Sequence, residues 1–399
     1  MKKFLVIIFL IGIYLVSAGI SYEVFGFFLK PKTQEVLVSP EVTPKESKFQ
    51  VILTGPKDRE CPINGAKLTK TEEDLWSGRR PLLIMIENHA DSRPQSGLSK
   101  ADVVYEAVAE GGIARFLAVY YCGIVAYSTE GEYDVGPVRS ARTYFLDWAS
   151  EYGDFPLYAH VGGAGQCSDP TVFQKAKALC QIENYHWKNK DSWSDLDQFS
   201  LGFKICRREP DRTGKTVATE HSMYCGTYAL WQTAEKRGLT NVNQNSKKLE
   251  PWDKNFKPWL FKDESPAGTS VSPEFYFWSG YEDYKVKWEY DSQANLYKRI
   301  NAGEPQVDFF TKENLVAKNV VIQFMKETNG VDEHKHILYQ TTGEGKAIVF
   351  QDGKEITGVW KKKDRLSRTR FYDNAGKEIK FNRGQIWIEI LPTTSKLVY

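Results

Sequence analysis

The chain has 399 residues, of which 41% are hydrophobic and 26% charged, so its composition is that of a folded protein rather than a disordered chain or a polytopic membrane protein. Its 53 Lys and Arg nearly balance its 51 Asp and Glu, and the net charge of +2 argues against nucleic-acid binding driven by overall charge. Aromatic residues make up 14% of the chain, which is typical of β-rich cores and of surfaces that face a sugar or a partner.

The N-terminal segment predicts a membrane anchor. An uncharged stretch over residues 4–22 follows two lysines, and an apolar tail from Val24 to Leu29 comes after Glu23. A helix of roughly 20 apolar residues crosses a bilayer, and the lysines favour an N-terminus on the inner side. We therefore predict a single-pass transmembrane helix within residues 1–29, with the bulk of the chain extracytoplasmic at the cell membrane. The alternative is a cleaved signal peptide, because Val16-Ser17-Ala18 resembles a cleavage site.

The segment after the anchor predicts a tether. Residues 30–48 mix three prolines with charged residues and contain few large apolar side chains. The chain also has six cysteines, an even number that can oxidise outside the cytoplasm. Six cysteines allow 15 pairings, and the sequence does not choose among them. Buried free thiols are the alternative.

Residues 49–240 predict an α/β domain. Continuous apolar or alternating runs indicate strands over 81–86, 101–109, 113–122 and 156–161. Apolar spacing and capping residues indicate helices over 140–152, 170–184 and 227–237. Because Gly111-Gly112 can form a tight turn between two of the strands, we expect a mixed rather than a purely parallel sheet.

The rest of the chain predicts a small antiparallel β domain. Residues 241–272 are polar and interrupted by prolines, so we interpret them as a linker. Within 273–399, apolar residues alternate with polar ones over 286–290 and 386–390. Turn signals at 352–353 and 373–376 separate further strand-like runs.

Candidate ligand-binding residues concentrate in four polar segments beside the predicted strand ends of the α/β domain. Loops at the carboxyl ends of strands form the ligand crevice in α/β folds, and arginines match phosphate or carboxylate groups. A glycine-rich turn adds backbone N–H groups that can face the same ligand. The candidates are Asn88, Arg93, Gln95, Asp102, Glu106, Glu110, Arg115, Arg139, Ser140, Arg142, His160, Gly162 and Gly163.

These residues permit three interpretations. The arginines can pair with the three acids at positions 102, 106 and 110 and brace the loops. They can instead line a pocket for an anionic or glycan ligand. The three acids can also hold a divalent metal that bridges to a phosphate. No spacing in the sequence identifies a metal or a cofactor, so the cofactor stays unknown.

Several motifs that resemble catalytic sites are incomplete. Gly214-Lys215-Thr216 lacks the first glycine of a phosphate-binding loop, and Ser140 lacks the flanking glycines of a nucleophile elbow. His334 and His336 have no third ligand nearby and are expected to be solvated. His160 and His221 are possible general bases, but a hydrogen-bonded structural histidine is the more common case. The catalytic residues are therefore unknown, and it stays open whether the protein is an enzyme.

Several segments in order resemble the family of YerB-like putative lipoproteins, a bacterial family of unknown function. The segments are 80–88, 93–98, 101–106, 110–116 and 136–142, and residues 288–392 resemble the C-terminal part of the family. The resemblance implies an envelope location and no established reaction. There is no lipidation cysteine near the N-terminus, and Ala114 stands where a hydroxyl residue is expected. A looser similarity in fold is to the LytR-CpsA-Psr phosphotransferases, which hold a polyprenyl pyrophosphate.

Three hypotheses follow from the sequence. The first is a non-catalytic envelope protein that binds a cell-wall glycan, another anionic ligand or a partner in the arginine-lined pocket. The second is an enzyme that acts on phosphorylated or pyrophosphorylated envelope precursors, in which the arginines neutralise charge developing during transfer. The third is a structural or assembly protein whose aromatic surfaces contact neighbours.

Overall fold

The computed structural model describes residues 55–127 and 133–399. The expected anchor (1–29) and tether (30–48) lie outside these residues and stay predictions. Among the described residues, no helix has the length and apolar character needed to cross a bilayer. Residues 51–399 form one compact unit.

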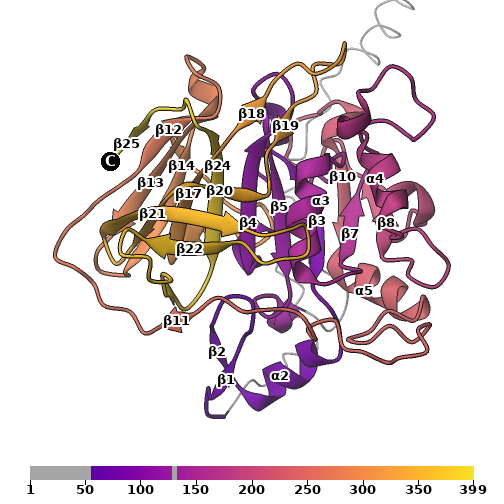
Figure 1. Ribbon diagram of the computed structural model, residues 1–399, viewed down its shortest axis with the longest axis horizontal. Helices are drawn as coiled ribbons and strands as arrows, with labels where there is room; N and C mark the ends of the chain where they lie inside the picture. Colours follow the sequence, from indigo (N-terminus) through magenta and orange to yellow (C-terminus); the bar gives the residue numbers. More distant parts are fainter. Residues whose placement is uncertain (1–54, 128–132) are drawn as a thin grey trace, which may run out of the picture. The chain divides into compact units, whose positions relative to one another are not determined.

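Within the described residues, ten strands form one mixed sheet, which we call the main sheet (Figure 1). Its order is β22-β21-β20-β17-β24-β4-β5-β3-β7-β8. The strands are β3 (Leu82–Glu87), β4 (Val103–Val108), β5 (Ala114–Tyr120), β7 (Leu157–His160), β8 (Asp195–Asp197), β17 (Asn319–Met325), β20 (Gly343–Gln351), β21 (Lys354–Lys362), β22 (Arg370–Asp373) and β24 (Ile386–Pro392).

The strands expected in the N-terminal half are present. Every residue of β3, β4 and β5 is buried, as expected for strands covered on both faces. β4 and β5 pair antiparallel across the turn at Gly111 and Gly112, whose φ angles of 60° and 75° suit glycine. β3 pairs antiparallel with β5 and parallel with β7, so the sheet is mixed, as expected.

The C-terminal half is rich in strands, as expected, but only part of them form a separate antiparallel sheet, and the others join the main sheet. β24 lies between β17 and β4 and pairs parallel with both. β17, β20, β21 and β22 continue the main sheet beyond it. The apparent alternation over 386–390 is therefore misleading, because β24 is buried on both faces and its acid Glu389 is buried with it.

A second sheet packs on one face of the main sheet, which we call the sandwich face. Trp288 of the second sheet meets Trp387 of β24 with ring centroids 5.1 Å apart. Alternate residues of β13 are buried, which is the pattern of a strand covered on one side. The strands are β12 (Glu274–Tyr276), β13 (Lys285–Asp291), β14 (Leu296–Asn301), β15 (Glu304–Pro305), β16 (Val316–Ala317) and β25 (Leu397–Val398).

Helices cover the opposite face, which we call the helical face. Tyr105 of β4 stacks on Trp148 of α3 (Thr143–Ala149) with ring centroids 5.8 Å apart. The helix expected over 140–152 is thus α3 followed by the single turn η4 (Ser150–Tyr152). The helix expected over 227–237 is α5 (Thr227–Lys236). The remaining α-helices in the described ranges are α2 (Lys70–Ser77) and α4 (Ala178–Asn184).

The helix expected over 170–184 is wrong in its first half. The chain there forms the short turn η5 (Gln174–Ala176) before α4 begins at Ala178. The Asp169 carboxylate accepts hydrogen bonds from the backbone and side chain of Thr171, 2.9 and 2.7 Å away. This bonding closes a local turn instead of capping a helix.

Three disulfides join the six cysteines as Cys61–Cys122, Cys167–Cys180 and Cys206–Cys225. Each braces loops or short strands of the N-terminal half. The short strands outside the two sheets are β1 (Arg59–Glu60), β2 (Lys67–Leu68), β6 (Asp134–Val135), β9 (Cys206–Arg208), β10 (Met223–Gly226), β11 (Phe261–Lys262), β18 (Glu327–Thr328), β19 (Leu338–Tyr339) and β23 (Phe381–Asn382).

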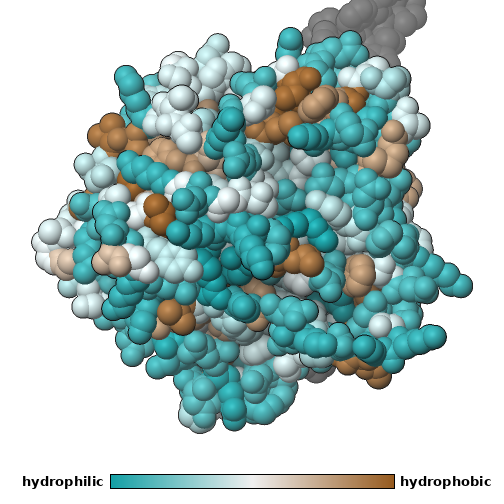
Figure 2. All heavy atoms as spheres, viewed as in Figure 1, coloured by the Kyte–Doolittle hydropathy of each residue, from teal (hydrophilic) through white to brown (hydrophobic). Residues whose placement is uncertain are grey.

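The surface in Figure 2 is mostly hydrophilic, and its hydrophobic residues form small, separate patches. Two phenylalanines, Phe199 and Phe203, are the most exposed large apolar side chains of the described chain, at 74% and 84%. Scattered exposed apolar residues are normal on a soluble surface. The face in this view therefore gives little support to the hypothesis of a broad aromatic docking surface.

Candidate functional site

Two acids and three arginines from the candidate segments gather on the helical face. Glu87 of β3 and Arg115 of β5 are cross-strand partners, so their side chains leave the sheet on the same side. Arg139 lies beside Glu87, with its Nε 3.0 Å from Oε1. We call Glu87, Glu110, Arg115, Arg139 and Arg142 the arginine cluster.

Glu110 holds the other end of the arginine cluster together. Arg142 donates two hydrogen bonds to its carboxylate, one from Nε to Oε1 and one from Nη2 to Oε2 at 2.6 Å. Arg115 donates to the same carboxylate at 3.4 Å and to the backbone carbonyl of Ser140 at 3.0 Å. A bidentate arginine pair fixes both partners, so these side chains form one ordered network.

Positive charge is in excess within the arginine cluster, because three guanidinium groups share two carboxylates. Burial, together with the repulsion of Arg142, lowers the pKa of Arg115 to about 10. Among the described residues, the buried Nε of Arg115 has no hydrogen-bond partner. Burial alone raises the pKa of Glu110, but the hydrogen bond and charge of Arg142 outweigh burial and the net shift is downward.

The rim of the arginine cluster is open to solvent. The Arg139 side chain is 25% exposed and that of Glu110 is 23% exposed, whereas Arg115 is only 9% exposed. A cleft of about 250 Å³ lies elsewhere, and none of its lining residues belongs to the cluster. The arginine cluster is therefore a charged, partly exposed region of the surface that lies outside this cleft.

Four further ionisable residues lie beside the arginine cluster, and none of them is in the candidate set. His221, named only as a possible base, binds Glu87 through Nδ1 at 2.7 Å and stacks on His89 with ring centroids 4.6 Å apart. His336 is buried against Asp332, 2.8 Å away, and its Nε2 lies 3.9 Å from Glu110. The expectation of a solvated His336 is therefore wrong. The sequence signal for His89 was its place two residues after β3, whereas the loop around His336 lies more than 200 residues from Glu110 in the sequence.

Asn88, Arg93, Gln95 and Glu106 lie on the sandwich face instead. Successive residues of a strand point to opposite faces, so Asn88 leaves the sheet on the side opposite Glu87. Its amide donates to Glu106 at 2.8 Å, and its oxygen accepts hydrogen bonds from Arg93 and Gln95, each at 3.1 Å. Arg93 therefore does not join the other three arginines.

Glu106 is part of a fully buried ion network. Arg299 of β14 donates to Glu106 at 2.6 Å and to Glu389 of β24 at 2.7 Å, and all three side chains have no exposed surface. Burial raises the pKa of Glu106 well above its usual range; Arg299 opposes this shift and the neighbouring Glu389 adds to it. We call Asn88, Glu106, Arg299 and Glu389 the buried network.

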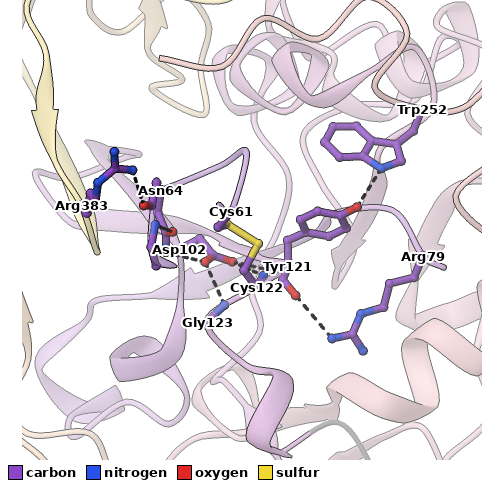
Figure 3. The surroundings of a disulfide bond; sticks show 11 residues. Cys61, Asn64, Arg79, Asp102, Tyr121, Cys122, Gly123, Trp252 and Arg383 are labelled. Atoms are coloured by element: carbon purple, nitrogen blue, oxygen red, sulfur yellow. Dashed lines mark hydrogen bonds between the residues drawn. A yellow bond between two sulfur atoms is a disulfide. The ribbon is translucent and has the colours of Figure 1, made fainter. Parts of the chain in front are cut away.

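Asp102 lies in a third place, next to the Cys61–Cys122 disulfide (Figure 3). Its carboxylate accepts hydrogen bonds from the backbone N–H groups of Tyr121, Cys122 and Gly123 at 2.6 to 2.9 Å. The amide of Asn64 donates to it at 2.7 Å. This carboxylate therefore organises the chain around the disulfide and is not a partner of the arginine cluster.

The three acids do not share a metal site. Asp102, Glu106 and Glu110 are spaced four residues apart along or beside β4, so neighbouring members lie roughly 13 Å apart along the strand. One divalent ion binds ligands at about 2–2.6 Å and cannot reach two of these acids. The interpretation of a metal bridged by these acids is therefore wrong.

His160 and the glycine-rich turn have structural contacts. His160 is buried, with Nε2 2.7 Å from Asp195 and Nδ1 2.6 Å from the carbonyl oxygen of Gly162. The Gly162 N–H donates to Asp197 at 3.3 Å. A Cβ at Gly163 would lie 3.0 Å from Leu179, so the turn packs closely against its neighbours. The turn also packs against the loop that carries Arg139 and Arg142, because the Ala141 N–H donates to the Gly162 carbonyl oxygen at 3.0 Å.

Comparison with known proteins places the chain in a family. Residues 68–240 match the N-terminal domain, and residues 276–388 the C-terminal domain, of a protein family of unknown function, DUF3048. The two matches together cover more than half of the chain. The chain belongs to this family. The arginine cluster lies within the part matched by the N-terminal DUF3048 domain, whereas the Arg299–Glu106 ion pair of the buried network joins the two matched parts.

Two relatives extend this comparison. The chain is 28% identical over 347 residues to the "Putative lipoprotein YerB" of Bacillus subtilis, covering 84% of this chain and 87% of that protein. It is also similar to the crystal structure of the YerB protein from Bacillus subtilis, with a TM-score of 0.65 and 25% identity. That match covers 86% of this chain and all of the other chain.

Proposed function

We propose that the protein is a membrane-attached, extracytoplasmic recognition protein that binds an anionic group of an envelope component on the arginine cluster. The location is supported by the apolar N-terminal segment, by three disulfides and by the relative whose name is "Putative lipoprotein YerB". The chain lacks a cysteine in its apolar N-terminal segment, so a transmembrane helix is the attachment we propose.

One observation carries the proposed ligand class: three guanidinium groups share two carboxylates at a solvent-exposed rim. A partly buried positive charge without a carboxylate partner is costly, and an incoming phosphate or carboxylate offsets that cost. Arg139 is the arginine at this rim, because a quarter of its side chain is exposed and Glu87 is its one carboxylate partner among the described residues. The ligand therefore contacts Arg139 first.

Recognition is favoured over group transfer by the positions of the acids. Asp102 is surrounded by four N–H donors, Glu106 is buried beside Arg299, and Glu110 is held by Arg142. None of these carboxylates is placed to act as a general base or to hold a metal beside the arginines. The enzyme acting on pyrophosphorylated precursors is the second candidate, and the test below separates the two.

The test measures the binding of inorganic phosphate and pyrophosphate to the chain from Phe49 onward, which contains the compact unit 51–399. We expect binding at low ionic strength that weakens as salt is added, because exposed charges are screened. Arg139→Gln is expected to weaken binding by about tenfold, equivalent to ~1.4 kcal/mol. Arg370→Gln is the matched control, because Arg370 also pairs with a single glutamate at the surface.

Two results would count against recognition. Binding that Arg139→Gln leaves unchanged would remove the arginine cluster as the site, and so would the absence of any phosphate or pyrophosphate binding at low salt. Release of inorganic phosphate from pyrophosphate, abolished by the same substitution, would favour the enzyme.

A further inference from the structure

Two histidines and one aspartate meet at the end of β3. His89 and Asp91 lie on the turn that follows the strand, which includes η1 (Ala90–Ser92), and His221 ends η7 (Thr219–His221). Each residue offers one ligand atom, and the three atoms lie within 4.8 Å of one another. Segments more than 120 residues apart in the sequence therefore bring three metal-binding side chains together.

The residue types match a transition metal of the zinc class. Two imidazoles and one carboxylate are a known ligand set for zinc, and they leave a fourth position for water or another ligand. His89 is 28% exposed and Asp91 is 67% exposed, so an ion from solvent can reach both side chains. The backbone N–H of Asp91 donates to Nδ1 of His89 at 3.2 Å, and this hydrogen bond is lost if Nδ1 becomes the ligand. His221 is the more buried ligand and provides the fixed side of the site.

Glu87 prepares His221 for this role. Its Oε2 is 2.7 Å from His221 Nδ1, and its Oε1 is 3.0 Å from Arg139. A carboxylate that accepts the proton of one ring nitrogen selects the tautomer whose other nitrogen carries a lone pair. Nε2 of His221 is therefore the atom offered to a metal. Histidines that bind metals are commonly oriented by such a carboxylate.

The stacking of the two imidazole rings shows which movement metal binding requires. The rings of His89 and His221 are nearly parallel, at an interplanar angle of 11°. Lone pairs lie in the ring planes, so two parallel rings do not point at one ion. Coordination therefore requires His89 to rotate out of the stack, which its partial exposure allows.

Another group of potential ligands is excluded by its chemistry. Cys61, Asp102 and Cys122 also lie close together, but the two sulfurs are joined in a disulfide. A metal binds thiolates, and a disulfide offers none.

We propose that His89, Asp91 and His221 form a binding site for one divalent transition metal of the zinc class, with Glu87 as the residue that positions His221. The site does not depend on anion binding by the arginine cluster, although Glu87 belongs to both.

The test is titration of Zn²⁺ into the full chain in detergent micelles, purified without a histidine tag, treated with chelator and kept under non-reducing conditions. Calorimetry is expected to show one equivalent of Zn²⁺ bound, and Co²⁺ is expected to give the visible absorption of a low-coordinate site. His89→Ala is expected to weaken Zn²⁺ binding by at least about 100-fold. Glu87→Gln acts through His221 and is expected to weaken binding by about 10- to 100-fold.

Two further variants keep the test decisive. Asp91→Asn alters an exposed side chain, so it reports on the site even if a substitution at the buried His221 prevents folding. His186→Asn is the matched control, because it removes an exposed histidine outside the site and keeps a residue that tolerates its φ of 61°. This control is expected to bind Zn²⁺ as the unaltered chain does.

The proposal is overturned if the chain binds no Zn²⁺, or if binding is unchanged by both His89→Ala and Asp91→Asn. Phosphate binding is measured separately in the presence of chelator, so a failure of the metal site and a failure of the anion site give different results.

Discussion

The arginine cluster and the buried network use the same kinds of side chain on opposite faces of the same strands. Both contain arginine and glutamate, and two consecutive residues contribute to them, Glu87 at the end of β3 and Asn88 directly after it. The arginine cluster has more arginines than acids and is open at its rim. The buried network has two acids for one arginine and no exposed surface among these three side chains.

The difference shows that burial, rather than residue type, decides whether a group of charged side chains can bind a ligand or only holds the fold together. A fully buried arginine held by two acids cannot reach a ligand, but it fixes how the two sheets pack, because Arg299 comes from the second sheet and its partners from the main sheet. A partly exposed cluster with excess positive charge has less effect on packing and is available to an anion.

Removing the arginine of the buried network is expected to have the largest effect. Arg299→Met leaves Glu106 and Glu389 buried together without a cation, which costs about 3–5 kcal/mol of unfolding free energy. Urea denaturation measures the loss. Lys298→Met is the matched control, because Lys298 is the preceding residue of β14 and its ion pair with Asp291 is partly exposed to solvent. Equal losses in the two variants would contradict the role given to burial.

Removing the acid of the arginine cluster is expected to have opposite effects on stability and on binding. Glu110→Gln leaves Arg115 and Arg142 without their shared carboxylate, which costs about 2–3 kcal/mol. The same change increases the excess of positive charge, so phosphate is expected to bind more tightly. A variant that is less stable and also binds phosphate less tightly would contradict this assignment.

The stability effect of Glu110→Gln also depends on pH in a defined direction. Because the pKa of Glu110 is lowered in the folded protein, its contribution is present above the unfolded value of about 4.5 and is lost as the pH falls through the folded value. Thermal unfolding between pH 7 and pH 3.5 is expected to show the difference between variant and unaltered chain shrinking toward the acid end.

Patterns within short segments of the sequence predicted the strands and turns that depend only on neighbouring residues. The continuous apolar run that became β3 and the glycine turn between β4 and β5 were correct because burial on both faces and positive φ leave direct marks in the sequence. The grouping of the arginines with Glu110 was partly predictable, because each of these residues lies at or next to the beginning or end of a strand or helix, at the same end of the sheet.

Long-range pairing was not predictable in the same way. Arg299 reaches Glu106 across 193 positions, and no local pattern marks either residue as the partner of the other. The insertion of β24 between β17 and β4 was missed because alternation over 386–390 looked like a half-exposed strand. The sequence did not predict that Arg93 and Arg139 lie on opposite faces of the main sheet. A step of one residue along a strand changes the face to which a side chain points, and the sequence does not locate the end of β3 to one residue.

The ion pair of His160 with Asp195 tests whether burial decides that a charged pair stabilises the fold rather than binding a ligand. His160 lies fully buried with Asp195. Burial alone lowers the pKa of His160, but the charge and hydrogen bond of Asp195 outweigh burial and the net shift is upward. The stabilisation is therefore complete below the unfolded value of about 6.5 and is lost as the pH rises through the folded value.

His160→Gln is accordingly expected to cost about 1.5 kcal/mol at pH 5.5 and less at pH 9, as measured by thermal unfolding. Phosphate binding is expected to stay unchanged, because the side chain of His160 bonds to Asp195 and to the Gly162 carbonyl oxygen rather than to an arginine of the cluster. A loss of phosphate binding in a folded variant would mean that the glycine-rich turn beside His160 contributes to the site.

Arg139→Gln is expected to have the smallest effect on folding and so gives the sharpest separation of the two roles. The Arg139 guanidinium is partly exposed, and its partner Glu87 keeps the hydrogen bond from His221, so the unfolding free energy is expected to fall by less than about 1 kcal/mol. The weakened phosphate binding of this variant is expected to be clearest at low salt and to fade as salt is added. A stability loss as large as that of Arg299→Met would instead mean that Arg139 braces the loops, and recognition would then have to be sought elsewhere on the surface.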